Sequence, residues 1–480
     1  MVIIKNYIAG EFSAPISGNY IRTFNPATGE VYAQTPDSDE RDVGLAVASA
    51  EKAFPEWSTT PAEQRAKILM RIADSIDHHL EKLALAESVD TGKSLALARS
   101  VDIPRASSNF RFFASGAMHF ASEAHAMESG AINYTLRQPL GVVACISPWN
   151  LPLYLFTWKI APALAAGNCV LGKPSEITPM TAYILSELCG EAGLPAGVLN
   201  IVHGYGHRAG AAMTSHPAIK AISFTGSTHT GAEIARLAAP KFKKLSLEMG
   251  GKNPNLIFAD CRYQEMLATT IRSSFSNQGQ ICLCGSRLLI ERSLYAKFRD
   301  DFVARAQQLK IGDPLNEGTE IGAVVSQQHL EKILFYIKLA KEEGGKILCG
   351  GCQVRKEGRC QNGWFVAPTV IENLPHDCRT NQEEIFGPVV TLIPFDSDEE
   401  VLQYANGSAY GLAAIIWTEN LTRAHRLANQ IQAGIVWVNC WMLRDLRTPF
   451  GGVKSSGTGR EGGWEALRFF TEPKNVCVKL

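Results

Sequence analysis

The sequence has no excess of charge of either sign. Its 480 residues carry 47 Lys and Arg against 47 Asp and Glu, so the formal net charge at neutral pH is zero. Proteins that bind nucleic acids or anionic membranes through their general surface need a basic excess, so we expect neither partner. A balanced total still leaves room for a local basic pocket.

Long apolar runs and patterned cysteines are missing as well. No uncharged apolar stretch reaches the roughly 18 residues of a membrane span, and the apolar run after Met1 is too short for a signal-peptide core. The 12 cysteines are scattered rather than spaced as in disulfide scaffolds or zinc sites. We therefore expect reduced thiols, no bound metal and a cytoplasmic protein.

The glycine fingerprint of dinucleotide-binding domains does not stand where such a domain would need it. G-x-G-x-x-G occurs at Gly457–Gly462, close to the C-terminus. That position leaves too few residues for the strand–helix–strand unit that the fingerprint requires. We interpret this segment as a glycine-rich turn.

Short apolar segments alternate with helical patterns from residue 138 onwards. Residues 41–125 are predicted to be helical, and 465–480 to form a terminal strand. Strands are predicted at 140–147, 169–172, 198–202 and 221–224, with helices at 151–166 and from the Thr178 N-cap to 193. Because the alternation continues from 250 to 440, the chain is predicted to be α/β with a parallel, doubly wound sheet. Such sheets bind nucleotides at the carboxyl ends of their strands.

Three segments place chemically useful side chains in turns rich in Gly and Pro. Asn150 ends Ser-Pro-Trp-Asn, Glu248 precedes Met-Gly-Gly-Lys-Asn-Pro, and Cys282 follows Asn-Gln-Gly-Gln-Ile. A thiol can attack a carbonyl, an amide can donate to an oxyanion, and a carboxylate can move protons. The residue types alone fit turn chemistry around a buried core equally well.

These segments resemble the motifs of the NAD(P)-dependent aldehyde dehydrogenase superfamily, and the likeness extends along essentially the whole chain. Further motifs in the family order are Lys173–Glu176, Phe224–Gly231, Glu384–Pro388 and Pro449–Gly452. The resemblance implies the aldehyde dehydrogenase fold, assembled into a homodimer or homotetramer. Its parts would be a Rossmann-like NAD-binding domain (1–119 and 138–247), an α/β catalytic domain (248–448) and a small β oligomerisation arm (120–137 and 465–480).

The same resemblance implies the catalytic roles. Cys282 would be the nucleophile, and Asn150 with the backbone N–H of Cys282 would hold the oxyanion. Glu248 would activate the water that hydrolyses the thioester. Cys284 reads as a packing residue, and Glu461 matches a position assigned to a proton relay in some relatives.

The implied cofactor is NAD. Glu176 matches a position that binds the adenosine ribose, where a carboxylate favours NAD over NADP by repelling a 2′-phosphate. Ser227, at a strand-to-helix turn, suits the pyrophosphate, and Glu384 and Phe386 would hold the nicotinamide ribose. The full set of implied cofactor contacts is Ile146, Ser147, Trp149, Lys173, Ser175, Glu176, Gly206, Phe224, Ser227, Met249, Glu384 and Phe386.

Two segments, 102–112 and 439–450, resemble the branch that oxidises 2-hydroxymuconate or 2-aminomuconate 6-semialdehyde. These substrates carry carboxylates, for which Arg is the planar bidentate donor. We expect Arg105 and Arg444 to anchor the carboxylate, with Arg111 and Arg447 as secondary candidates. Leu151, Tyr154 and Trp158 would line the substrate tunnel. The alternative for Arg444 is a surface ion pair with Asp445 or Glu461, and Arg105 has a purely structural alternative too.

Three other functions stay open. The first is an aldehyde dehydrogenase for another aldehyde, such as an aliphatic semialdehyde, a retinal-like or a betaine-type substrate. The second is a scaffold protein that reuses this fold, against which the intact Cys282, Glu248, Asn150 and Glu176 argue. The third is a Cys–His hydrolase, for which none of the motifs supplies a histidine.

Overall fold

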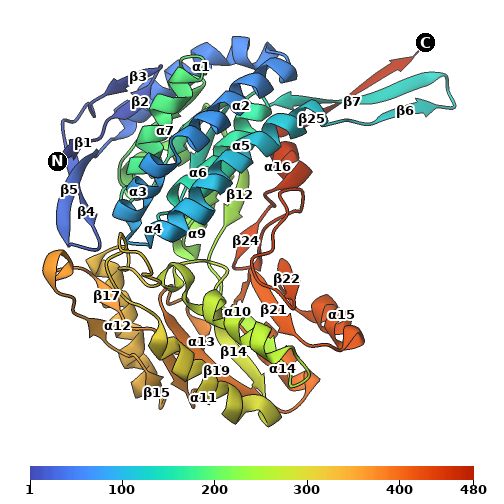
Figure 1. The fold of residues 1–480 in the computed structure, drawn as a ribbon. Helices are drawn as coiled ribbons and strands as arrows, with labels where there is room; N and C mark the ends of the chain where they lie inside the picture. The colour runs from blue at the N-terminus through green and yellow to red at the C-terminus, as the bar shows by residue number, and fades with distance from the viewer. Residues whose placement is uncertain (480) are drawn as a thin grey trace.

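An eight-stranded sheet forms the core of the first α/β body, the upper body in Figure 1. The computed structural model describes residues 1–479. The strand order is β24-β12-β11-β8-β9-β10-β2-β3, in which β24 is Gly457–Thr458, β2 is Asn6–Ile8 and β3 is Glu11–Ser13. The strands from β12 to β10 run parallel. The parallel strands are β8 (Val142–Ile146), β9 (Cys169–Lys173), β10 (Leu199–Ile201), β11 (Ile219–Thr225) and β12 (Lys244–Glu248). The predicted α/β class and parallel sheet are confirmed.

Helices cover this sheet. They are α1 (Glu40–Thr59), α2 (Ala62–His78), α3 (Leu80–Thr91), α5 (Ile103–Met118), α6 (Pro152–Ala165), α7 (Met180–Glu191), α8 (Ala211–Ser215) and α9 (Thr228–Ala238). Every residue of α6 is buried, because this helix is packed among α2, α5, α7 and the sheet. The predicted Thr178 cap of α7 is wrong: its hydroxyl donates to the Trp149 carbonyl at 3.3 Å, and α7 has no side-chain cap.

A second, seven-stranded sheet forms the core of the lower body (Figure 1). Its order is β15-β18-β19-β14-β13-β21-β22, and only β15 (Lys346–Cys349) is antiparallel to its neighbour. The parallel strands are β13 (Asn253–Ile257), β14 (Gly285–Glu291), β18 (Thr369–Glu372), β19 (Val389–Phe395), β21 (Ala413–Trp417) and β22 (Ile435–Val438). Its helices are α10 (Tyr263–Phe275), α11 (Arg292–Gln308), α12 (Gln327–Glu342), α14 (Asp398–Asn406) and α15 (Leu421–Gln430).

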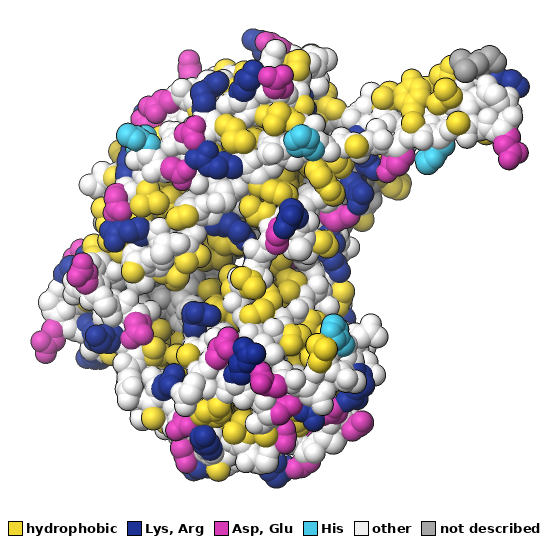
Figure 2. All heavy atoms as spheres, turned by 45° about the vertical axis from the view of Figure 1, so that its right-hand side comes forward, with side chains coloured by type: hydrophobic (Ala, Val, Ile, Leu, Met, Phe, Trp, Pro, Cys, Tyr) yellow, Lys and Arg dark blue, Asp and Glu magenta, His cyan; other side chains and the backbone are white. Residues whose placement is uncertain are grey.

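A three-stranded antiparallel arm projects from the first body (Figures 1 and 2). It pairs β6 (Ala124–Met127), β7 (Ala131–Pro139) and β25 (Thr471–Lys479). The arm exposes large apolar side chains, namely Met127, Ile132, Leu136 and Val478. The predicted terminal strand is confirmed over Thr471–Lys479, but its start at 465 is wrong, because α16 (Gly463–Phe469) comes first and packs near α5 and α6. Residue 480 lies outside the described residues.

The glycine-rich segment near the C-terminus returns to the first sheet. Its strand β24 (Gly457–Thr458) pairs antiparallel with the end of β12, so the lone fingerprint is an edge strand and a turn, as the sequence indicates. Among residues 1–479, no helix has the length and apolar character that a bilayer crossing requires.

Candidate active site

The carboxyl ends of the parallel strands bring several of the expected residues to one edge of the first sheet. Trp149 and Asn150 follow β8, Ser227 follows β11, and Met249 follows β12. Because parallel strands end on the same side, these turns lie together at the position where doubly wound sheets bind ligands. The first body therefore supplies one wall of a site from turns that are far apart in sequence.

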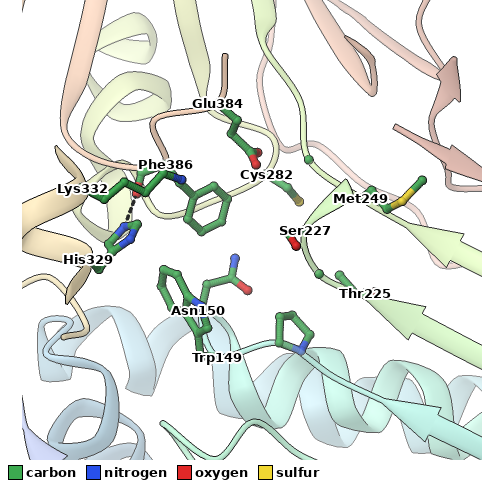
Figure 3. A pocket seen from close by; sticks show the side chains of 13 residues that line it. Trp149, Asn150, Thr225, Ser227, Met249, Cys282, His329, Lys332, Glu384 and Phe386 are labelled. Carbon is green, nitrogen blue, oxygen red and sulfur yellow. Dashed lines mark hydrogen bonds between the residues drawn. The ribbon is translucent and has the colours of Figure 1, made fainter. Parts of the chain in front are cut away.

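The second body supplies the other wall, and the two walls enclose a space that we call the first cavity (Figure 3). In Figure 3, Asn150 and Cys282 point into this space from opposite sides, with Glu384 and Phe386 beside the thiol. The lining residues are Pro148, Trp149, Asn150, Thr225, Gly226, Ser227, Met249, Gly250, Cys282, His329, Lys332, Glu384 and Phe386.

Two side chains in this lining are not indicated by any sequence motif. His329 and Lys332 lie on α12, in a segment without any motif. The His329 Nε2 atom is 2.7 Å from the Phe386 carbonyl oxygen, and its ring packs edge-on against Trp149 at 5.0 Å between centroids. Burial lowers the pKa of His329 to about 4, so the ring is neutral at physiological pH. Their spacing of three residues indicates a shared helix face, but only the tertiary structure decides that this face meets the cavity.

The remaining expected cofactor residues lie near the strand ends but outside the lining of the first cavity. This group consists of Ile146, Ser147, Lys173, Ser175, Glu176, Gly206 and Phe224. Within it, the Lys173 ammonium is 3.2 Å from the Glu176 carboxylate. Ser227 caps α9, because its hydroxyl oxygen accepts the Thr230 N–H at 3.2 Å. The first backbone N–H groups of α9 therefore stand beside the cavity, where they suit an anion.

The turn before Cys282 has an unusual backbone. Asn277 and Gln278 have φ angles of 51° and 56°, in the left-handed region that non-glycine residues seldom adopt. Gly279 continues this conformation at φ 70°, and a Cβ there would lie 2.1 Å from the Gly387 carbonyl oxygen. Backbone conformations of this kind cost about 1–3 kcal/mol each and persist where surrounding contacts fix them. The turn is thus held in place by its neighbours rather than by its own preferences.

Asn253 fixes the backbone on the other side of the nucleophile. Its side-chain Nδ2 donates to the carbonyl oxygens of Cys282 at 2.7 Å and Cys284 at 2.9 Å. Its Oδ1 accepts the Ala413 N–H at 3.1 Å. Cys284 itself is buried, and burial raises its thiol pKa to about 12, in keeping with a packing residue. Asn253 was not among the residues expected from the sequence motifs.

A second cavity lies on the far side of Cys282. Its lining residues are Leu151, Tyr154, Leu155, Thr225, Glu248, Met249, Ile281, Cys282, Leu283, Leu412, Met442, Arg444, Phe450 and Glu461. Thr225, Met249 and Cys282 line both cavities, so the thiol stands between them. Burial, followed by the Glu384 carboxylate, raises the pKa of Cys282 to about 12, and the Arg444 guanidinium opposes this shift.

Glu248 is buried in the second cavity. Within residues 1–479, neither of its carboxylate oxygens has a hydrogen-bond partner. Burial first, and then the neighbouring Glu461, raise the pKa of Glu248 well above its ordinary value. Room for it comes from Gly451, where a Cβ would lie 2.5 Å from a Glu248 oxygen. Glu461 accepts hydrogen bonds from Lys159 at 2.5 Å and Ser223 at 2.9 Å.

Arg444 is half-buried and held by aromatic side chains. Its Nη1 donates to the Tyr154 hydroxyl at 2.7 Å, and its guanidinium lies 4.0 Å from the Phe450 ring centroid and 5.6 Å from that of Trp158. Within residues 1–479, no carboxylate comes within ion-pair distance of Arg444. The surface ion-pair alternative is therefore wrong: Asp445 pairs with Arg447 at 2.6 Å instead.

The other arginines are placed less favourably. The Arg105 guanidinium lies 5.4 Å from the Tyr154 ring centroid, outside the lining of the second cavity. Arg111 is engaged by Asp74 at 2.7 Å and by Asp77, on the surface. The Arg447 side chain is 80% exposed. Neither secondary candidate, Arg111 or Arg447, is available as a carboxylate anchor.

Comparison with known proteins decides the family. The model of the aldehyde dehydrogenase family matches residues 13–476. The chain belongs to the aldehyde dehydrogenase family. It is therefore an aldehyde dehydrogenase, and the predicted fold and enzyme class are confirmed.

Three relatives illustrate the likeness. The chain is 50% identical to the 2-aminomuconic semialdehyde dehydrogenase of Bos taurus, covering 100% of this chain and 99% of that protein. It is 47% identical to the 2-hydroxymuconic semialdehyde dehydrogenase of Pseudomonas sp. (strain CF600), covering 99% of each. The NAD+ complex of an aldehyde dehydrogenase from Bacillus cereus superimposes with a TM-score of 0.97 at 40% identity, covering 99% of this chain and 96% of that chain.

Proposed function

We propose that this chain oxidises 2-aminomuconate or 2-hydroxymuconate 6-semialdehyde to the dicarboxylic acid, with NAD as the oxidant. The observation that carries the proposal is Arg444, a half-buried guanidinium in the second cavity with no carboxylate partner of its own among residues 1–479. A partly desolvated guanidinium without a carboxylate partner favours an anionic ligand, and a carboxylate on the substrate would supply charge-assisted hydrogen bonds. The names of the similar bovine and Pseudomonas proteins agree with this substrate class.

The residues around Cys282 suit each chemical step. The Cys282 thiol first loses its proton to solvent, and the resulting thiolate attacks the aldehyde carbon. The Asn150 amide with the Cys282 N–H holds the oxyanion of the thiohemiacetal. NAD, when bound, supplies the acceptor for the hydride that leaves the former aldehyde carbon. Glu248 then takes a proton from the water that hydrolyses the thioester, which releases the acid and restores the thiol.

The first cavity fits the nicotinamide end of NAD. The Glu384 carboxylate is fixed by the Gly251 N–H at 2.9 Å and faces the cavity, where it can accept hydrogen bonds from ribose hydroxyls. At the adenosine end, the half-buried Glu176 carboxylate would repel a 2′-phosphate, which favours NAD over NADP. On this basis we propose that the residues which the family resemblance implies as cofactor contacts bind NAD.

The projecting arm supports an assembly of several copies. It exposes apolar side chains on strands with unpaired edges, which in a monomer would invite non-specific association. We propose that the arm is covered by a second copy in a homodimer or homotetramer, and that the enzyme works in the cytoplasm.

The decisive experiment follows reduced-cofactor absorbance with purified protein. The two muconate semialdehydes are compared with a simple aliphatic aldehyde of similar length, each with NAD and with NADP. We expect kcat/KM to be highest for a muconate semialdehyde with NAD. Equal kcat/KM values for the carboxylate-free aldehyde would refute the substrate class, and absence of turnover with every aldehyde would refute the mechanism. Cys282→Ser must abolish aldehyde oxidation while the protein stays folded.

A further inference from the structure

A fully buried lysine lies beneath the proposed oxyanion site, outside the residues considered so far. Lys93 follows Gly92, the left-handed C-cap of α3, and its side chain has no exposed surface. Its ammonium contacts the Asp102 carboxylate and donates to the backbone carbonyl of Asn150 at 3.1 Å. Glu87, also fully buried, lies 3.7 Å from the same ammonium. None of the proposed catalytic steps uses this charge.

The Asn150 carbonyl that Lys93 contacts is part of a closed polar network. Asn277 Nδ2 donates to the same carbonyl at 3.1 Å and to the Gln280 carbonyl at 3.2 Å. The Asn150 side-chain amide donates to the Gln280 carbonyl at 2.9 Å. The network therefore links the turn after β8 in the first body to the strained turn before Cys282 in the second.

Burial makes this arrangement stiff. An ammonium that has lost water needs its partners, so leaving Asp102 and the Asn150 carbonyl would be costly. Lys93 is also anchored from behind, because Gly92 packs against the second body: a Cβ on Gly92 would lie 2.5 Å from the Ala323 carbonyl oxygen. The buried Lys93 ammonium therefore holds the Asn150 backbone carbonyl in a fixed position.

We propose that Lys93, paired with Asp102, is a positioning residue that fixes the Asn150 backbone and so aims its amide at the oxyanion formed on Cys282. The proposal rests on the proposed role of Asn150, but not on the identity of the aldehyde. Oxyanion donors act only at short range, and small displacements of reacting groups cost large factors in rate.

The test uses the full-length enzyme and any aldehyde that the wild type oxidises, a simple aliphatic one included. Lys93→Met leaves Asp102 buried without its cation, so the paired variant K93M/D102N removes both charges at nearly constant shape. The matched control is Lys82→Met on α3, where the lysine is 53% exposed and lies 3.6 Å from Glu187. For every variant, thermal unfolding and the Kd for NAD are measured beside kcat and KM.

We expect K93M/D102N to lower kcat by about 10-fold or more, with a nearly unchanged Kd for NAD, because a misplaced donor weakens the transition state. The same pair is then introduced into Asn150→Ala. If Lys93 acts through the Asn150 amide, K93M/D102N should lower kcat by less than about 2-fold in the Asn150→Ala background, because the effects of coupled residues are not additive. Equal losses in both backgrounds, or an unchanged kcat in K93M/D102N, would overturn the proposal. A wild type that oxidises simple aldehydes but no muconate semialdehyde refutes the proposed substrate and leaves this test intact.

Discussion

Replacing Arg444 by Met removes the guanidinium while keeping most of the apolar contact with Phe450 and Trp158. A hydrogen bond between charged groups contributes about 1.5–3 kcal/mol. We therefore expect kcat/KM for a muconate semialdehyde to fall by roughly 10- to 150-fold. Arg444 is held by the Tyr154 hydroxyl and by two aromatic rings, so its position is set before the substrate binds. Binding therefore costs little side-chain entropy, and most of the hydrogen-bond energy contributes to kcat/KM.

A second effect of the same substitution has to be separated from the first. Arg444 also opposes the rise in the pKa of Cys282, so its loss makes the thiolate scarcer for every aldehyde. The informative quantity is therefore the ratio of kcat/KM for the semialdehyde to kcat/KM for an uncharged aldehyde, in which the shared thiol effect cancels.

The assay is steady-state cofactor reduction with both aldehydes, for wild type, Arg444→Met and the control Arg447→Met. Arg447 pairs with Asp445 on the surface, so its replacement should leave the ratio unchanged. A ratio that stays constant in Arg444→Met, with both substrates slowed equally, would refute the carboxylate anchor. Partial recovery in Arg444→Lys would support a charge-based contact.

Other expectations can be tested with single variants. Glu248→Gln should keep a burst of reduced cofactor but lose steady-state turnover, because acylation does not need the base. Stopped-flow absorbance measures the burst, and a missing burst would contradict this role. Because the pKa of Glu248 is raised, its carboxylate form appears only as pH rises above the ordinary Glu range. Thioester hydrolysis should therefore speed up over that pH range, and single-turnover rates that do not change with pH would contradict the role of Glu248 as the base. Cys282 has a thiol pKa raised to about 12, so iodoacetamide should label it faster at each higher pH through pH 9, with a rate independent of pH as the contrary result. Asn253→Ala should lower the free energy of unfolding by about 1–3 kcal/mol and slow acylation, as denaturant titration and burst rates can determine. Glu176→Ser should raise kcat/KM with NADP relative to NAD; an unchanged ratio would contradict the role given to this carboxylate.

Residue patterns along the sequence predicted many of the strands and helices. The strands at 140–147 and 169–172 and the helix at 151–166 could be placed from the sequence. Runs of β-branched residues indicate buried strands, and apolar residues at helical spacing indicate a helix. The errors fell at the ends of elements. Thr178 has the residue type of a cap, but its hydroxyl bonds to Trp149, a contact set by the neighbouring turn. Residues 465–469 were predicted as strand, yet they belong to α16, which packs against α5 and α6.

The sequence by itself determined the family, the enzyme class and the candidate residues Cys282, Glu248 and Asn150, because turns with fixed chemistry leave recognisable motifs. It could not place His329 and Lys332, since a helix face reveals its partner only after packing. It also left the environment of Arg444 open. Only the tertiary structure set its guanidinium against aromatic rings, and left Asp445 to pair with Arg447, since the partners of a charge depend on which segments meet in space.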